Sequence, residues 1–206
     1  MKAVVVHSHG PVAAQRVEAV ADPVAGPGEV LVEVHAAGLN FPDILVIEGK
    51  YQILPPRPFS PGKELAGVVR AVGADVTTCK PGDRVMAWVE HGAYAELALV
   101  PQAQCFVMPA AMTFAEGAAM GLTYITAWFA LRDRAQAQPG ERVLVTGAAG
   151  GLGLACVQVA RAIGCTVIAG ITNPDRADLV RRSGAAHVVD LAAENLRDSL
   201  RKQGAA

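Results

Sequence analysis

The sequence predicts an α/β protein in which a β-rich N-terminal domain, residues 1–115, is followed by a parallel βαβ domain, residues 116–206. Proline and glycine interrupt the first part so often that no long helix fits there. The second part alternates short apolar strands with segments of helical length. A glycine-rich loop joins one of those strands to the helix after it, which is typical of nucleotide-binding βαβ units.

Short β-rich runs between turn residues characterise the N-terminal part. The run at 31–34 alternates apolar and polar side chains, as a half-buried strand does. Short strands at this spacing favour a barrel-like or sandwich-like domain. The strands expected here span residues 2–7, 29–35, 66–72 and 84–89.

The C-terminal part begins with an alanine-rich segment, 113–132, whose apolar residues recur at helical spacing. We expect strands over 142–146, 165–171 and 187–191, and helices over 154–163, 173–182 and 195–202. Three strands joined by helices make only the first mononucleotide half of a doubly wound parallel sheet. We therefore expect an incomplete Rossmann domain.

Composition excludes several classes of function. The chain of 206 residues has 18 basic and 19 acidic side chains and 5% aromatic residues, so neither a basic face nor a stacking platform for nucleic acid is expected. The longest uncharged apolar stretch, 143–160, is broken by glycines, so no membrane partner is expected. The four cysteines form no C-x-x-C pair and indicate reduced thiols in a cytoplasmic protein.

The glycine-rich loop is the strongest mechanistic signal. Glycines let the backbone approach a pyrophosphate, and the N-terminus of the following helix supplies N–H groups and a partial positive charge. The alternative is a tight turn that packs helix against strand without a ligand. The loop residues expected to bind a dinucleotide are Gly147, Ala148, Gly150, Gly151, Leu152 and Gly153.

The end of the strand at 165–171 indicates which dinucleotide is bound. A site that prefers NAD usually places an acidic residue there for the ribose hydroxyls. Here the strand is followed by Thr172 and Asn173, and Arg176 comes shortly after and suits a 2′-phosphate. The alternative is that Arg176 is an ordinary solvated helix residue, and the neighbouring Asp175 supports that alternative. We expect NADPH as the cofactor.

Seven segments of the chain together form a specific pattern. Residues 36–43 read AAGLNFPD, 61–73 read PGKELAGVVRAVG and 148–153 read AAGGLG, and the further segments are 26–32, 81–85, 92–96 and 121–123. In their residues, order and spacing the chain resembles the quinone-oxidoreductase branch of the medium-chain dehydrogenase/reductase superfamily. The resemblance implies a GroES-like N-terminal domain followed by a Rossmann domain.

The same resemblance implies that no metal is bound. Zinc-dependent relatives place a cysteine in the segment 38–40, a histidine at Lys63 and a further cysteine at Leu122. Zinc needs three or four nitrogen, sulfur or oxygen ligands that converge on one point. The five histidines are scattered, and a metal at the pair His7 and His9 is the weak alternative.

Catalytic residues are also implied by the resemblance rather than by spacing. In the family, the segment around Asn40 and Tyr51 borders the nicotinamide and the substrate. Asn40 would orient the cofactor or acceptor, Tyr51 would donate a proton to the developing oxygen anion, and Thr123 would contact the nicotinamide side. The alternatives are that Asn40 is a turn residue and Tyr51 a packing aromatic. Leu45 and Lys63 depart from the pattern of the branch.

Three functions follow from these observations. The first is an NADPH-dependent oxidoreductase that transfers hydride to a quinone or another electron-poor α,β-unsaturated carbonyl without zinc. The second is a reductase of 2-enoyl thioesters of the enoyl- or acryloyl-CoA type. The third is a truncated, non-catalytic nucleotide-binding or interaction protein, because family members are much longer. The resemblance also implies a homo-oligomer in the full-length form.

Overall fold

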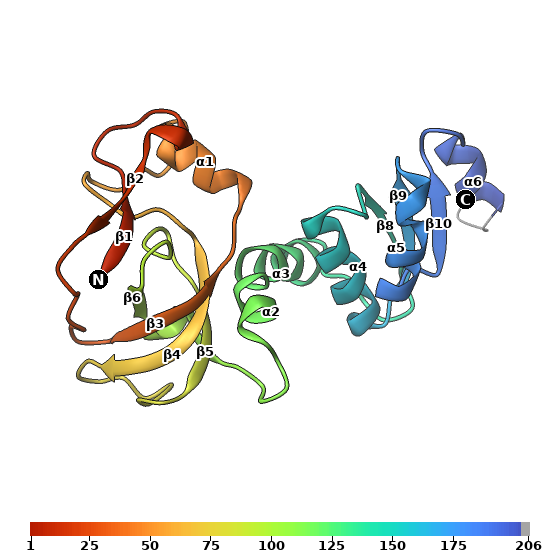
Figure 1. Ribbon diagram of the computed structural model, residues 1–206. Coiled ribbons are helices and arrows are strands. Elements are labelled where there is room, and N and C mark those ends of the chain that lie inside the picture. Colours follow the sequence, from red (N-terminus) through yellow and green to blue (C-terminus); the bar gives the residue numbers. More distant parts are fainter. Residues whose placement is uncertain (203–206) are drawn as a thin grey trace. The chain divides into compact units, whose positions relative to one another are not determined.

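The computed structural model describes residues 1–202, which divide into two compact units, with the boundary between Leu122 and Thr123. The first unit is mainly antiparallel β-structure and the second is a parallel sheet with helices, so the α/β fold expected from the sequence is confirmed. Figure 1 shows the elements of both units along the chain.

Unit one is built on a five-stranded antiparallel sheet in the order β6-β3-β4-β5-β7, and a separate hairpin pairs β1 with β2. Valine dominates the inward-facing positions of β3 and β4, and the core beneath them includes Val30, Val32, Leu65 and Val69. The strands are β1 (Lys2–Val5), β2 (Arg16–Ala19), β3 (Glu29–Ala37), β4 (Glu64–Val72), β5 (Arg84–Trp88), β6 (Leu97–Pro101) and β7 (Cys105–Val107).

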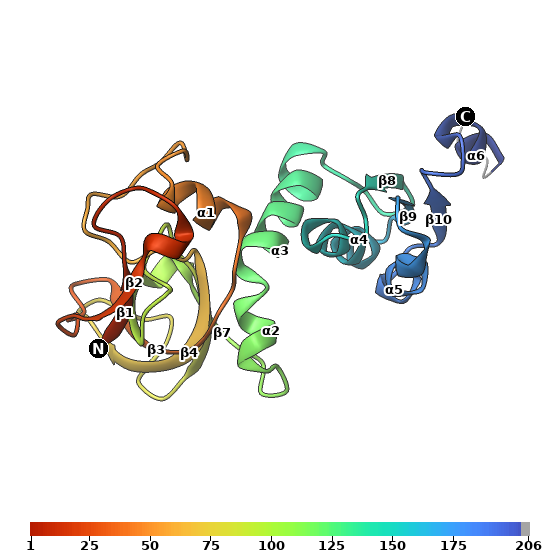
Figure 2. The same ribbon diagram turned by 45° about the horizontal axis from the view of Figure 1, so that its top comes forward.

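Helices and short turns complete this unit. Helix α2 packs on β3, β4 and β5, which Figures 1 and 2 show at one side of the sheet. It begins at a capping box, in which Thr113 accepts from the backbone N–H of Glu116 and Glu116 accepts from that of Thr113. The elements are η1 (Val12–Ala14), α1 (Phe41–Ile47), η2 (Gln102–Gln104) and α2 (Phe114–Ala118).

Unit two contains the three-stranded parallel sheet β10-β9-β8, the order expected of one mononucleotide half. Helix α4 packs on β8 and β9 and contacts α5, which packs on β10. The strands are β8 (Arg142–Thr146), β9 (Thr166–Ile171) and β10 (His187–Asp190). The helical elements are α3 (Gly121–Trp128), η3 (Phe129–Arg134), α4 (Gly151–Ile163), η4 (Pro174–Arg176), α5 (Ala177–Ser183) and α6 (Leu196–Lys202).

Several boundaries differ from the sequence-based expectation. The helix expected over 113–132 is divided into α2, α3 and a π-helical turn, because α2 ends at Ala118 and a new helix begins at Gly121. Helix α4 begins at Gly151, so three loop residues belong to its first turn. The expectation included neither α1 nor β2, β6 and β7.

Among residues 1–202, no helix has the length and apolar character needed to cross a lipid bilayer.

Candidate functional site

The loop after β8 makes a sharp turn into α4. Gly147 has a φ of +63°, in the left-handed region that favours glycine. The N–H of Gly150 then donates to the carbonyl of Gly147 at 3.0 Å, and the N–H of Leu154 donates to the carbonyl of Gly150 at 2.8 Å. This pattern closes the turn and begins the helix with Gly150 as its N-cap.

Gly153 is the loop position at which close packing most strictly requires glycine. A Cβ atom on Gly153 would lie 2.2 Å from the Gly147 oxygen and 2.7 Å from the Ala148 Cα, both backbone atoms. The same atom on Gly150 would lie 3.4 Å from the Gly147 oxygen, an ordinary contact. Gly153 therefore lets the first turn of α4 pack against the loop.

The N-terminus of α4 has the geometry of an anion site. Gly150 has no side chain to cap the helix, so no capping side chain takes up the N–H groups of the first turn. Thirteen residues of helix align their peptide dipoles behind this end. Thr123 lies beside it, because a Cβ atom on Gly151 would be 3.8 Å from the Thr123 Cγ2. A phosphate group fits these N–H groups.

The residues after β9 lie at the surface of the same unit. Thr172, Asn173 and Arg176 are all exposed. The side-chain oxygen of Asn173 accepts from the N–H of Asp175 at 3.0 Å, so Asn173 caps the short helix η4. Within the described range, the Arg176 guanidinium makes neither a hydrogen bond nor an ion pair with another residue. Among residues 1–202, Arg176 is therefore an unpaired cation in η4, shortly after the end of β9.

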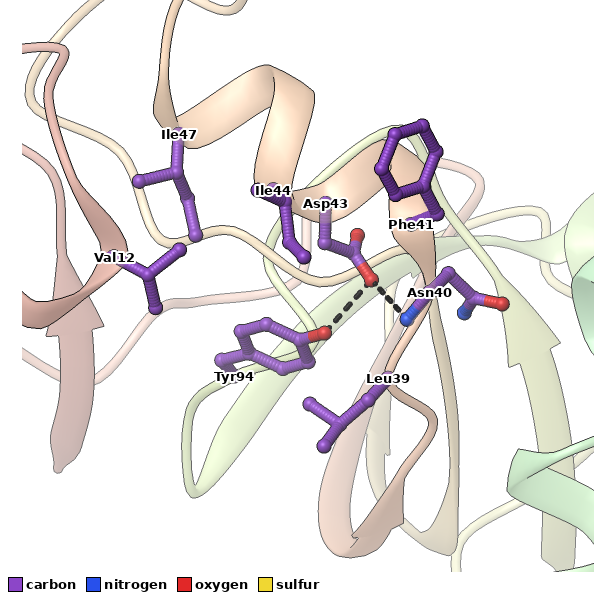
Figure 3. Close-up of a pocket in the computed structure, with 8 residues that line it drawn as sticks. All are labelled: Val12, Leu39, Asn40, Phe41, Asp43, Ile44, Ile47 and Tyr94. Carbon is purple, nitrogen blue, oxygen red and sulfur yellow. Dashed lines mark hydrogen bonds between the residues drawn. The ribbon is translucent and has the colours of Figure 1, made fainter.

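In the first unit, Asn40 is the N-cap of α1, and its backbone N–H donates to the Asp43 carboxylate at 2.9 Å. The same carboxylate oxygen accepts from the Tyr94 hydroxyl at 2.7 Å, as Figure 3 shows. The sequence pattern Asn40-x-x-Asp43 before an apolar run is the signal that could have predicted this helix start.

Asp43 is a buried acid with an incomplete set of partners. It is 3% exposed, and burial raises the pKa of its carboxyl, although its bonds to Tyr94 and Asn40 and the charge of Lys63 act in the opposite direction. Burial and the bond to Asp43 also raise the pKa of Tyr94. The Asp43 Oδ1 atom has no hydrogen-bond partner among the described residues.

The Asn40 side chain is held by Glu64, the first residue of β4. Its amide nitrogen donates to Glu64 Oε1 at 2.7 Å, and Glu64 Oε2 accepts from the backbone N–H of Leu122 at 2.7 Å. The Asn40 side chain also takes part with Asp43 in the capping box of α1, so Asn40 has a structural role.

Next to this network lies an apolar pocket of about 520 Å³. Figure 3 shows its side chains, among which the polar groups are those of Asn40, Asp43 and Tyr94. Phe41 is 71% exposed, so part of this apolar surface faces solvent. The lining residues are Val12, Leu39, Asn40, Phe41, Asp43, Ile44, Ile47 and Tyr94.

Tyr51 is half-buried and packs against the small core cluster of Val6, Val46, Ile47 and Phe59. The Lys63 ammonium lies over its ring, with 4.7 Å between Nζ and the ring centroid. Tyr51 does not line the pocket of Figure 3. The structure thus brings Asn40 together with Asp43 and Glu64, and Tyr51 together with Lys63.

Asn40, Lys63 and Leu122, at the positions compared above with the ligands of zinc-dependent relatives, are not a set of side chains that fits a metal. In the described part of the chain, no three side chains of His, Cys, Asp or Glu are grouped to hold an ion. His7 lies 3.0 Å from a Glu18 carboxylate oxygen and His9 3.3 Å from the Ile47 carbonyl, so the two imidazoles have separate partners. All four cysteines are free, and burial raises the pKa of Cys105 to about 12.

An antiparallel β-unit followed by a βαβ unit with a glycine loop is the domain order of the medium-chain dehydrogenases and reductases, and the comparisons place the chain in that class. The model of the alcohol dehydrogenase GroES-like domain matches residues 26–110, and the model of the zinc-binding dehydrogenase family matches residues 151–205. The chain belongs to the quinone-oxidoreductase-like branch of the medium-chain dehydrogenase/reductase superfamily, a family of oxidoreductases.

Individual relatives support this assignment. The chain is 42% identical over 180 residues to the rat (Rattus norvegicus) synaptic vesicle membrane protein VAT-1 homolog, covering 87% of this chain and 45% of that protein. It is 41% identical over 187 residues to the quinone oxidoreductase-like protein 2 of the same organism, covering 90% and 53%. The chain thus spans about half the length of these curated relatives.

A solved structure shows the same fold. The crystal structure of Escherichia coli quinone oxidoreductase complexed with NADPH superposes with a TM-score of 0.83 and 30% sequence identity. The superposition covers 100% of this chain and 63% of that chain.

Proposed function

We propose that the chain is the NADPH-binding and acceptor-binding part of an oxidoreductase that delivers hydride to a quinone or another electron-poor α,β-unsaturated carbonyl. The observation that carries the proposal is the loop at the head of α4, where only glycine fits at Gly153. The similarity of the chain to a quinone oxidoreductase whose structure was solved with NADPH supports the choice of cofactor.

The second unit offers separate groups for the separate charges of NADPH. The uncapped N–H groups at the start of α4 suit the pyrophosphate, with Gly147, Ala148, Gly150, Gly151, Leu152 and Gly153 forming the cradle. Arg176 has no competing partner in the described chain, so it is available for the 2′-phosphate, with Thr172 and Asn173 beside it. Thr123, next to Gly151, would contact the nicotinamide side.

The first unit would supply the groups that orient the cofactor or acceptor and that donate a proton to the acceptor. NADPH provides a hydride, and reduction of the acceptor also needs a proton on its oxygen. The side-chain oxygen of Asn40 would accept a hydrogen bond from the cofactor or acceptor, and the Asn40 amide nitrogen is held by Glu64. The Tyr51 hydroxyl would donate the proton. No metal takes part, because Asn40, Lys63 and Leu122 are not a ligand set.

Two other functions remain as competing candidates. Asn40, Asp43 and Tyr51 equally suit a reductase of 2-enoyl thioesters. A non-catalytic nucleotide-binding or interaction protein is the third candidate. Such a protein would bind cofactor or partner without turnover.

We assign residues 1–115 to the substrate domain and residues 116–206 to the first mononucleotide half of the NADP-binding domain. In a doubly wound sheet the fourth strand pairs with the first, which here is β8. Homo-oligomerisation of a full-length form, a small-molecule substrate and a cytoplasmic location belong to the same proposal.

The test is NADPH oxidation by the purified chain with 1,4-benzoquinone or crotonyl-CoA, with Tyr51→Phe as the variant. We expect turnover with benzoquinone that falls in Tyr51→Phe. Faster turnover with crotonyl-CoA would favour the thioester reductase instead. Absence of turnover with every acceptor, in a chain that binds NADPH, would favour the non-catalytic function.

A further inference from the structure

Lys63 is a buried cation within the first unit. Its side chain is 5% exposed, whereas lysine is seldom buried unless its charge is paired. The ammonium donates to the Glu90 carbonyl and to a Glu90 carboxylate oxygen, both at 3.0 Å. The Glu90 side chain is itself 50% exposed, so the pair joins a buried cation to a solvated anion.

A contribution to folding stability does not by itself explain why a charged side chain is buried at Lys63. The backbone of Lys63 is already fixed, because its carbonyl accepts from the N–H of Val89 at 2.7 Å. Burying an ion pair costs desolvation that its attraction often fails to recover, and an apolar side chain of similar volume often serves as well. Packing alone therefore does not account for the buried ammonium of Lys63.

The ammonium faces the ring of Tyr51. The distance of 4.7 Å from Nζ to the ring centroid lies within the range of a cation–π interaction. Tyr51 is only partly held by its apolar neighbours, and its hydroxyl makes no hydrogen bond with any residue of the described chain. Lys63 is therefore the polar group that fixes this ring.

The charge of Lys63 also reaches two other groups. It lowers the pKa of Asp43, against the larger effect of burial, and it lowers the pKa of His91 in the same direction as burial. Asp43 has an Oδ1 atom without a partner. Lys63 thus contacts the exposed carboxylate of Glu90 and the Tyr51 ring, and its charge also acts on the buried Asp43.

We propose that Lys63 is a positioning residue for Tyr51 in the reduction step, an inference that rests on the proposed function. Lys63 itself does not touch the substrate. In the step, the acceptor carbon gains a hydride, which NADPH would supply in becoming NADP⁺, the acceptor oxygen takes the Tyr51 proton, and the Tyr51 O–H bond breaks. Solvent then returns a proton to the Tyr51 oxygen, while the ammonium over the ring keeps the ring in place.

The first test needs no turnover. In the full chain labelled with ¹³C-tyrosine, Tyr51→Phe identifies the Tyr51 ring signals among the three tyrosines. We expect Lys63→Met to shift the Tyr51 signals, Lys63→Arg to restore them largely, and Tyr124 in the second unit to remain unchanged. Lys63→Gln keeps a hydrogen-bond donor for Glu90 and serves as the neutral variant if Lys63→Met does not fold.

The second test is the split between kcat and KM. Lys63→Met should lower kcat with benzoquinone roughly tenfold, with the KM for NADPH unchanged and with rescue by Lys63→Arg. Tyr51 signals that do not move in either neutral variant would overturn the inference whatever the turnover. Moved signals with an unchanged kcat would also overturn it. Moved signals in a chain without any turnover would support the contact and count against the proposed function alone.

Discussion

The side-chain amide of Asn40 donates to the buried carboxylate of Glu64 at 2.7 Å, and this bond ties the start of α1 to the start of β4. The second oxygen of Glu64 accepts from the N–H of Leu122. One carboxylate thus holds the residue that we propose to orient the cofactor or acceptor. The geometry of Asn40 and the stability of the first unit should therefore depend on the same residue.

Replacing Glu64 by alanine should destabilise the protein by about 1–3 kcal/mol, because two donors lose their acceptor in a buried site. Urea unfolding measures the change. The matched control is Glu33→Ala, whose carboxylate pairs with the exposed Arg70 and should contribute less than about 1 kcal/mol. Equal losses in the two variants would contradict the buried network.

The glycine loop offers a matched pair of variants. Gly153→Ala places a Cβ atom against the Gly147 carbonyl oxygen and should cost about 1–3 kcal/mol by overpacking. Gly150→Ala has room for its Cβ and a φ of −82°, so its free energy of unfolding should change little. Thermal unfolding distinguishes them, and a well-tolerated Gly153→Ala would show that the loop does not pack as described.

Asp43 should make stability depend on pH. Its folded-state pKa is raised above 3.8 by burial, so the folded state holds this proton more tightly than the unfolded state. The contribution is complete below pH 3.8 and is lost as the pH rises through the folded-state pKa. Asp43→Asn keeps an oxygen acceptor for Asn40 and Tyr94 but cannot titrate.

Urea unfolding of both proteins over that pH range tests the sign. The stability of Asp43→Asn relative to the wild type should increase as the pH rises from 3.8 through the folded-state pKa. A relative stability that falls over the same range would mean that the Asp43 carboxylate is favoured by its hydrogen bonds more than it is disfavoured by burial.

Periodicity and turn chemistry predicted the second unit closely. Strand β8 was expected over the residues that form it, and β9 and β10 differ at one end only. These strands are short apolar runs flanked by helices, and only β9 is buried along most of its length, so their pattern is local. The start of α4 was placed late because glycines disfavour helices, whereas here they occupy the first turn, where close approach to the loop outweighs that cost.

The N-terminal site was harder to predict because its contacts are distant in sequence. Asn40 meets Glu64 across 24 residues, and Asp43 meets Tyr94 across 51. No local pattern encodes these pairs, and only the resemblance to a family pointed to Asn40 and Tyr51. Lys63 departs from the pattern of that family. The sequence does not indicate its contact with Tyr51, which depends on the fold.

The central claim is tested most directly by calorimetric titration of the purified chain with NADPH and with NADH. We predict micromolar NADPH binding, about −8 kcal/mol, and weaker binding of NADH. Arg176→Ala should weaken NADPH roughly tenfold and leave NADH unchanged, because a charge-assisted contact to the 2′-phosphate is lost. Arg182→Ala, an exposed arginine on α5, is the control and should change neither. A folded chain that binds neither dinucleotide, or binds both equally with or without Arg176, would contradict the account.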